Sequence, residues 1–156
     1  MARRDDQTLD IFNDWQPEQA VTRFPDATVQ SVSLRGRIAR AVSAALHDCE
    51  AEGGRAEIAG RMSAWLEGET VSKHVLDAYA SEGREEHTIS AVRLAALIHA
   101  TGDIRPLQLI AEMFGYAVIE DRFLPWIELG QIADRKVELD RRYESARRAA
   151  RRRPAR

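Results

Sequence analysis

The sequence is poor in the features that mark membrane, secreted and disulfide-rich proteins. None of the apolar runs in its 156 residues approaches the ~20 residues that a transmembrane helix needs. The start, MARRDDQTLD, lacks the apolar centre of a signal peptide. The single cysteine, Cys49, cannot form an internal disulfide. These absences predict a cytoplasmic protein with no membrane span and no membrane partner.

Signatures of enzymes and metal sites are also missing. The chain contains no GxxxxGKS/T, GxGxxG, GxSxG or HExxH motif and no CxxC pair. Its four histidines lie on separate predicted elements: His47, His74, His87 and His99. A metal site built from His47 and Cys49 is disfavoured, because residues two apart on a helix point to different faces. We therefore expect a protein that is not an enzyme, with no catalytic residue, no metal and no cofactor.

Aromatic residues and runs of β-branched residues are scarce as well, which bears on the fold class. Aromatics make up 6% of the chain although 44% of it is hydrophobic, and runs of Val and Ile are short. Such a composition predicts few strands, so we expect an all-α protein of single-domain size. Three segments are predicted: an N-terminal arm (1–30), a helical domain (31–121) and a C-terminal helix with a basic tail (122–156).

The N-terminal arm shows no long helical period and carries two prolines. It holds a short apolar group that includes Phe12 and Trp15. In one interpretation the arm packs across the domain. In the other, Phe12 and Trp15 form a docking peptide for a partner protein, since large aromatics serve as anchors in such interfaces.

A strong helical pattern begins at Ser31 and continues to about residue 52. Ser31 or Ser33 is the expected N-cap, and Gly53 and Gly54 are expected to end the helix. One apolar stripe follows the three- and four-residue spacing of a helix: Leu34, Ile38, Val42, Ala45, Leu46 and Cys49. The stripe predicts a helix with one face in the core.

Residues 55–82 are predicted to form two short helices joined by a turn. The first helix has an apolar stripe: Ile58, Ala59 and Met62. Thr70 or Ser72 caps the second helix, which has three apolar anchors: Val75, Leu76 and Tyr79. The outer face of the second helix is expected to carry the remaining residues: Lys73, His74, Asp77, Ala78 and Ser81. This order is typical of a helix-turn-helix, here expanded by WLEGE in the turn.

Two more helices are predicted after this segment. Thr88 or Ser90 caps the first, and Gly102 ends it. Its expected buried face follows helical spacing: Ile89, Val92, Ala95, Ala96 and either Ile98 or His99. The second helix starts with Pro106 in its first turn and is expected to place four side chains in the core: Leu107, Leu109, Ile110 and Met113. The following residues, YAVIED, form either a strand or an extended connector.

From about Leu124 the chain becomes helical again and carries a heptad-like seam. Its members repeat at alternating spacings of three and four: Leu129, Ile132, Lys136, Leu139, Tyr143, Ala146 and Ala150. Such a helix could pair with a second copy in a dimer, pack back on the domain, or stay a single solvated helix.

The net charge of the C-terminal segment is opposite in sign to that of the rest of the chain. Residues 135–156 hold ten of the 23 Lys/Arg and three of the 25 Asp/Glu, a net of +7, so residues 1–134 carry −9. A basic tail neutralises DNA phosphates and releases their counterions, and five residues are its expected contacts: Arg147, Arg148, Arg151, Arg152 and Arg153. Residues 55–82 hold three Lys/Arg against five Asp/Glu. Helices that contact DNA bases usually carry more positive charge than this.

The successive segments AEIAGRMS, VSKHVLDAYASE and ISAVRLAALIHATGDIRPLQLIAEMFGY resemble the lambda-repressor-like helix-turn-helix domains of phage regulators in the lambda CII style. Over roughly residues 10–130 the chain is similar, more closely, to small proteins from the early regions of Mu-like transposable phages. The ATGD and DAYASE segments are the most distinctive parts of this resemblance. It implies a bundle of about five helices followed by a long C-terminal helix, in a DNA-binding or transposition-associated setting.

We therefore expect a DNA-binding protein of a Mu-like phage or prophage that acts in transcriptional regulation or transposition on double-stranded DNA. A dimer or higher oligomer is expected, because one short helix reads too few base pairs for useful specificity. The expected groove contacts lie on the second helix: Ser72, Lys73, His74, Asp77 and Ser81. The rival hypothesis is a helix-turn-helix scaffold that serves as an interaction module for a host or phage protein.

Overall fold

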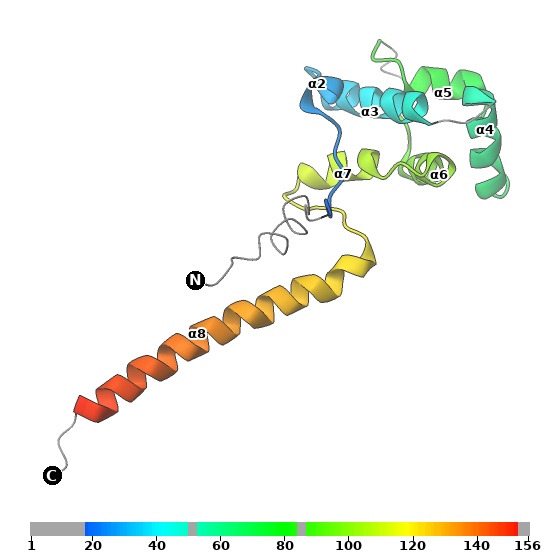
Figure 1. The fold of residues 1–156 in the computed structure, drawn as a ribbon. Helices are drawn as coiled ribbons and strands as arrows, with labels where there is room; N and C mark the ends of the chain where they lie inside the picture. The colour runs from blue at the N-terminus through cyan, green and yellow to red at the C-terminus, as the bar shows by residue number, and fades with distance from the viewer. Residues whose placement is uncertain (1–17, 50–52, 84–86, 153–156) are drawn as a thin grey trace, which may run out of the picture. The chain divides into compact units, whose positions relative to one another are not determined.

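The computed structural model describes residues 18–49, 53–83 and 87–152, and over these residues the protein is all-helical, as predicted (Figure 1). The helices follow in this order: α2 (Asp26–Val29), α3 (Leu34–Asp48), α4 (Gly54–Trp65), α5 (Lys73–Tyr79), α6 (Ala91–Thr101), α7 (Arg105–Glu112), the 3-10 helix η1 (Asp121–Phe123) and α8 (Leu124–Arg152). Residues 116–120 form an extended connector rather than a strand. No helix in the described ranges combines the length and the apolar content needed to cross a bilayer.

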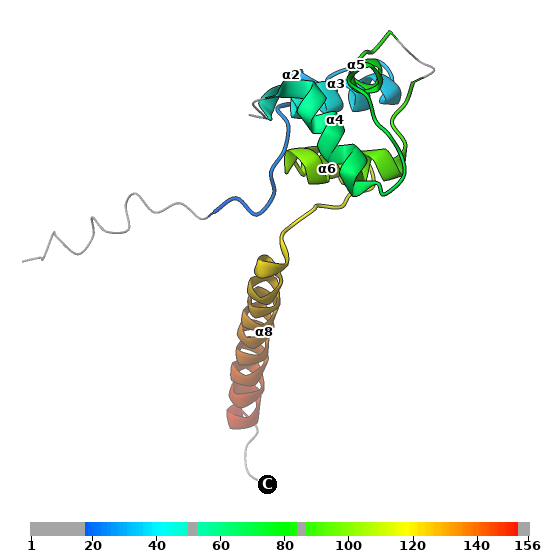
Figure 2. The same ribbon diagram turned by 90° about the vertical axis from the view of Figure 1, so that its right-hand side faces the viewer.

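The helices divide into two compact units. The first ends at Val118 and the second begins at Ile119, so the second consists of η1 and the long helix α8. The first unit has its main core between α3, α4, α5 and α6 (Figure 2). Its largest fully buried apolar side chains come from all four helices: Val42, Ile58, Met62, Leu76 and Leu97. The most extensive helix pairing in this unit is between α4 and α6.

A second, smaller core joins α2, α3 and α7. It consists of five buried side chains: Phe24, Val29, Ala41, Ala45 and Leu109. Phe24 and Val29 belong to the predicted N-terminal arm, so this part of the arm packs on the helical body. Phe12 and Trp15 lie outside the described residues.

Arg105 links three parts of the first unit. Its guanidinium lies 4.3 Å from the centre of the Phe24 ring and donates hydrogen bonds of 2.7 Å to Asp48 and to Asp103. The hydrogen bonds that Arg105 donates to Asp103, and then the one that it donates to Asp48, raise the pKa of Arg105 above its usual value. The charged side chain therefore ties the end of α3 to the start of α7 and covers the aromatic ring that leads into α2.

Three helices begin at a serine whose hydroxyl accepts the backbone N–H three residues later: Ser33 from Gly36 (3.0 Å), Ser72 from Val75 (3.4 Å) and Ser90 from Arg93 (3.3 Å). In each case the serine was one of two candidates in the sequence. Such a cap stabilises a helix by about 1 kcal/mol, so local chemistry determines where α3, α5 and α6 begin.

The prediction that Gly53 and Gly54 end the α3 helix was wrong. Cys49 already has an extended backbone, so α3 ends at Asp48. Gly53 instead caps the start of α4, where its N–H donates to the Glu57 carboxylate at 2.8 Å. By contrast, Gly102 ends α6 as predicted, because it adopts the left-handed conformation (φ 71°) and its N–H bonds to the Ile98 carbonyl at 2.8 Å.

The buried faces of α6 and α7 differ in part from the predicted ones. Of the predicted set for α6, Ile89 and Ala96 are buried and Ile98 is partly buried, whereas Val92, Ala95 and His99 are exposed. α6 also buries three residues outside that set: Leu94, Leu97 and Ala100. α6 is apolar around most of its circumference, so spacing alone allows more than one face to point inward, and packing on α4 selects among them. On α7, Leu107 is exposed whereas Leu109 is buried and Ile110 and Met113 are partly buried.

Gln108 takes the inward position next to Leu109. Its side chain is 1% exposed and both ends of the amide are used. The amide oxygen accepts from the Val118 N–H at 2.6 Å, and the amide nitrogen donates to Glu112 at 2.7 Å. A buried amide with both groups paired avoids the cost of desolvation and holds the middle of the connector that follows α7.

A pair of substitutions on α6 tests which face of this helix is buried. Leu97→Ala should lower the free energy of unfolding by about 2–5 kcal/mol, because it leaves a cavity in a packed core. Val92→Ala should change it by less than about 0.5 kcal/mol, since Val92 is 57% exposed. Urea denaturation followed by circular dichroism measures both. Similar losses for the two variants would contradict the finding that α6 buries Leu97 and exposes Val92.

Candidate functional site

The segment α4–α5 keeps the predicted order of two helices and a long turn. Residues 66–72 connect the helices, and Glu67 (φ 43°) and Gly68 (φ 135°) make the sharp part of the turn. Val71 returns the chain to the core, where it is 4% exposed. Its N–H donates to the Ser63 hydroxyl at 2.8 Å, and that hydroxyl donates to the Ala59 carbonyl at 2.8 Å. The turn is therefore held against α4 at a defined point.

An ion pair joins the two helices directly. The Arg55 guanidinium at the start of α4 donates to the Asp77 carboxylate on α5 at 2.6 Å. The hydrogen bond from Arg55 lowers the pKa of Asp77. On the other side of α5, Arg93 of α6 donates to the Tyr79 hydroxyl and to Glu69. These contacts hold α5 in one orientation on α4 and α6.

Of the residues predicted on the outer face of α5, two serve the structure of the unit. Ser72 caps the helix and Asp77 bonds Arg55. Lys73 and His74 are exposed at the first turn of α5, where no described residue bonds them. Ser81 follows the end of α5 and is half-buried, so it is not part of the helical face.

Ala78 was wrongly predicted on the outer face of α5. It is 6% exposed and thus belongs to the buried side with Leu76 and Tyr79. The helix has only seven residues and packs against both α3 and α4. A wider share of its surface is therefore covered than a single apolar stripe predicts.

The acidic balance of residues 55–82 is largely compensated in the folded unit. Four of its carboxylates bond arginines: Glu57 with Arg61, Glu69 with Arg93, Asp77 with Arg55, and Glu82 with Arg40. Two of these arginines, Arg40 and Arg93, come from outside the segment. The surface near α5 is therefore less negative than the segment's own charge count indicates.

The arginines of α8 fall into two groups. Three are paired with carboxylates along the same helix: Arg135 with Glu138 (3.0 Å), Arg142 with Glu138, and Arg147 with Glu144 (3.3 Å). The others have no carboxylate partner among the described residues: Arg141, Arg148, Arg151 and Arg152. The predicted tail contact Arg147 thus belongs to the paired group, and Arg153 lies outside the described range.

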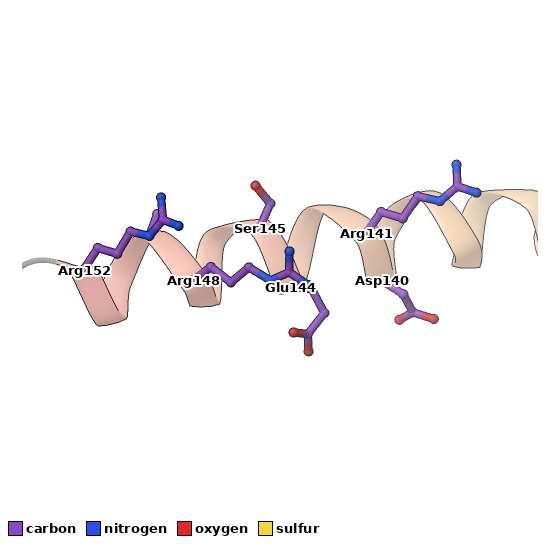
Figure 3. A pocket seen from close by; sticks show the side chains of 7 residues that line it. Asp140, Arg141, Glu144, Ser145, Arg148 and Arg152 are labelled. Carbon is purple, nitrogen blue, oxygen red and sulfur yellow. The ribbon is translucent and has the colours of Figure 1, made fainter.

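Three unpaired arginines form a basic stripe, which we define as Arg141, Arg148 and Arg152. Their spacings of seven and four residues place them on one side of an α-helix, and Ser145 lies between them (Figure 3). In Figure 3 the carboxylates of Asp140 and Glu144 point away from Arg141 and Arg152. Arg141 was not among the predicted contacts, which were the arginines nearest the end of the chain. The spacing itself was the available signal.

The basic stripe lines a shallow hollow of about 860 Å³ along α8, together with Asp140, Glu144, Ser145 and Ala149. All of its lining residues come from this one helix, so its walls cannot surround a small ligand in the way a binding pocket does. Nor do any three His, Cys, Asp or Glu side chains gather as a metal site within the described ranges. The stripe is suited to an extended anionic surface rather than to a small molecule.

Comparison of the chain with models of protein families, with curated proteins and with solved structures finds no match to any of them.

The Arg55–Asp77 pair has a testable pH signature. Because the folded-state pKa of Asp77 is depressed, the pair stabilises the protein above the ordinary carboxyl pKa of 3.8, and this contribution is lost as the pH falls through the folded value. Asp77→Asn should therefore lower the thermal unfolding midpoint at about pH 7, and its difference from wild type should shrink toward about pH 3. The exposed Glu67, which has no described partner, supplies the control Glu67→Gln. A constant difference for Asp77→Asn at all pH values would refute the coupling.

Proposed function

We propose that the protein binds double-stranded DNA through the basic stripe of α8 and through α4–α5 acting as a helix-turn-helix. The observation that supports this most directly is the alignment of Arg141, Arg148 and Arg152 on one helical face without carboxylate partners among the described residues. Guanidinium groups form strong, geometrically defined hydrogen bonds with phosphate. A row of them on a rigid helix matches the repeated phosphates of a duplex.

The stripe would supply affinity without sequence preference. From Arg141 to Arg152 an α-helix rises by about 16 Å, a length over which a DNA backbone presents several phosphates. Each phosphate contact releases condensed counterions, so binding should weaken steeply with salt. Arginines already held by Glu138 or Glu144 contribute less, because contact with phosphate would compete with their existing partners.

The α4–α5 segment would supply orientation and sequence preference. Lys73 and His74 occupy the first turn of α5 and are exposed, and the N-terminal residues of the second helix are those that reach base edges in a helix-turn-helix. The arginine pairing of Glu57, Glu69 and Asp77 reduces the repulsion that these carboxylates would exert on DNA. The family resemblance supports a role in regulation or transposition of phage DNA.

A second candidate function is an interaction module for another protein. Trp65 is 44% exposed, and its ring stacks on His99 with 5.5 Å between the centroids. A hollow of about 470 Å³ lies beside the two rings. Tryptophan is enriched at the energetic centres of protein interfaces, which favours this alternative. Failure of the wild-type protein to bind any duplex at low salt would favour it further.

Two double variants of α8 test the basic stripe. Arg141→Ala/Arg148→Ala should weaken binding to all duplexes and reduce the slope of log K against log salt by about 1.8. The matched control, Arg142→Ala/Arg147→Ala, removes the same charge from arginines that have carboxylate partners, and should change the slope clearly less. Fluorescence anisotropy with random duplexes over a series of salt concentrations measures both. Equal changes in the two variants would show that net charge, not the stripe, determines affinity.

The role of α5 is tested separately. A preferred duplex is first selected from a random pool with the wild-type protein. Lys73→Ala/His74→Ala should then weaken binding to this duplex by about 1–3 kcal/mol for each side chain that had bonded a base edge, with little change on random duplexes. If no preferred sequence emerges from the pool, the reading role of α5 is wrong while the role of the stripe stands.

A further inference from the structure

α8 exposes a row of large apolar side chains on the side of the helix away from the basic stripe. Leu129, Ile132, Leu139 and Tyr143 are each more than half exposed, and no side chain of α8 is buried. Together with Lys136, Ala146 and Ala150 they form the heptad-like seam. Apolar side chains that are exposed in a row along one helical face are costly to hydrate. The seam therefore requires a covering surface.

We propose that the seam is covered by a second copy of this chain, so that two α8 helices form a parallel coiled coil. The pairing is separate from DNA binding, because it uses the opposite face of the helix. The first argument is the repeat. The seam advances by 3.5 residues per turn over three heptads, whereas a straight α-helix has 3.6 and would rotate the seam by about 20° per heptad. A left-handed supercoil with another helix of the same repeat keeps such a seam continuous.

The second argument is charge complementarity along the edges of the seam. With Leu129 at position a, Arg135 falls at g and Asp140 at the following e. In a parallel pair these positions face each other across the two helices, so Arg135 of each copy, which also bonds Glu138 of its own helix at 3.0 Å, meets Asp140 of the other. In an antiparallel pair with the whole seam overlapped, g faces g, and Arg135 would meet Arg142. The charges thus favour the parallel arrangement.

One flanking pair opposes this register. Arg142 at g and Arg147 at e would face each other in a parallel pair, but each has a carboxylate partner on its own helix, Glu138 and Glu144 respectively. Their mutual repulsion is therefore reduced. Arg141 and Arg148 fall at position f, the position farthest from a partner helix. Dimerisation would leave the basic stripe accessible on both copies.

Lys136 gives the interface a limited stability and a fixed alignment. It is the one charged member of the seam and lies at position a, between the Ile132 and Leu139 layers. A single lysine at such a position lowers the stability of a coiled coil but specifies its register and number of strands. This predicts a modest dimer that becomes tighter when Lys136 is made apolar.

Sedimentation of the full chain over a range of micromolar concentrations tests the proposal. The wild type should show a concentration-dependent dimer, Leu139→Glu should raise the dimer dissociation constant by about 100-fold or more, and Lys136→Ile should lower it by about tenfold. Arg141→Ala/Arg148→Ala should leave self-association unchanged while weakening DNA binding, which separates the two proposals. Circular dichroism checks that each variant keeps its helical content.

Other outcomes would overturn the proposal. A chain that stays monomeric in both the wild type and Lys136→Ile, with a lower unfolding midpoint in Leu139→Glu, would show that the seam packs within its own chain. Orientation is tested by Ala146→Cys in a Cys49→Ser background, with Cys49→Ser alone as the control. Oxidation should link the parallel dimer, because the two 146 positions share one layer. A dimer that forms no such disulfide would contradict the parallel arrangement.

Discussion

The packing of α4 on α6 is the interaction on which the rest of the first unit depends. Ile58 and Met62 on α4 belong to the same buried cluster as Ala96 and Leu97 on α6, and these two helices are the most extensively paired of the unit. α5, with seven residues, is far shorter than a helix that is stable alone in water. It is ordered because Leu76 enters the core that α4 and α6 create. The exposed positions of Lys73 and His74 are consequences of that core.

The charged side chains of the protein differ in whether they are paired, and the net charge of a segment does not describe this difference. In the first unit, arginines from α3, α4 and α6 neutralise the carboxylates around α5, so the acidic balance of that segment is largely compensated. On α8 the arginines outnumber the carboxylates, and the excess collects on one face. A partner interacts mainly with unpaired charges, since paired ones must first be separated. This is why the basic stripe, rather than the end of the chain as a whole, carries the proposed DNA contact.

Much of the helical fold could be predicted from residues close together in the chain. Ser72 and Ser90 were among the predicted caps, Gly102 ends α6 as expected, and α8 begins at the predicted residue. The candidate site was less predictable. The spacing of Arg141, Arg148 and Arg152 is visible in the sequence, but the pairing of Arg147 with Glu144 and of Asp77 with Arg55 depends on side-chain geometry. Spacing alone placed Ala96 correctly on the buried face of α6 but also placed Val92 there instead of Leu97, because the two are equally apolar candidates.

The primary sequence alone determines the all-helical character, a pair of candidate caps for each of three helices, the heptad spacing of α8 and the segregation of charge, because these depend on side chains within about four residues of one another or on composition. Tertiary structure decides which face of α6 is buried, why Gln108 rather than Leu107 points inward, and which carboxylates have their charge compensated. These outcomes depend on contacts such as Arg40 with Glu82, which lie 42 residues apart in the chain. No local pattern specifies such a contact, since it forms only when the core has brought α3 and the end of α5 together.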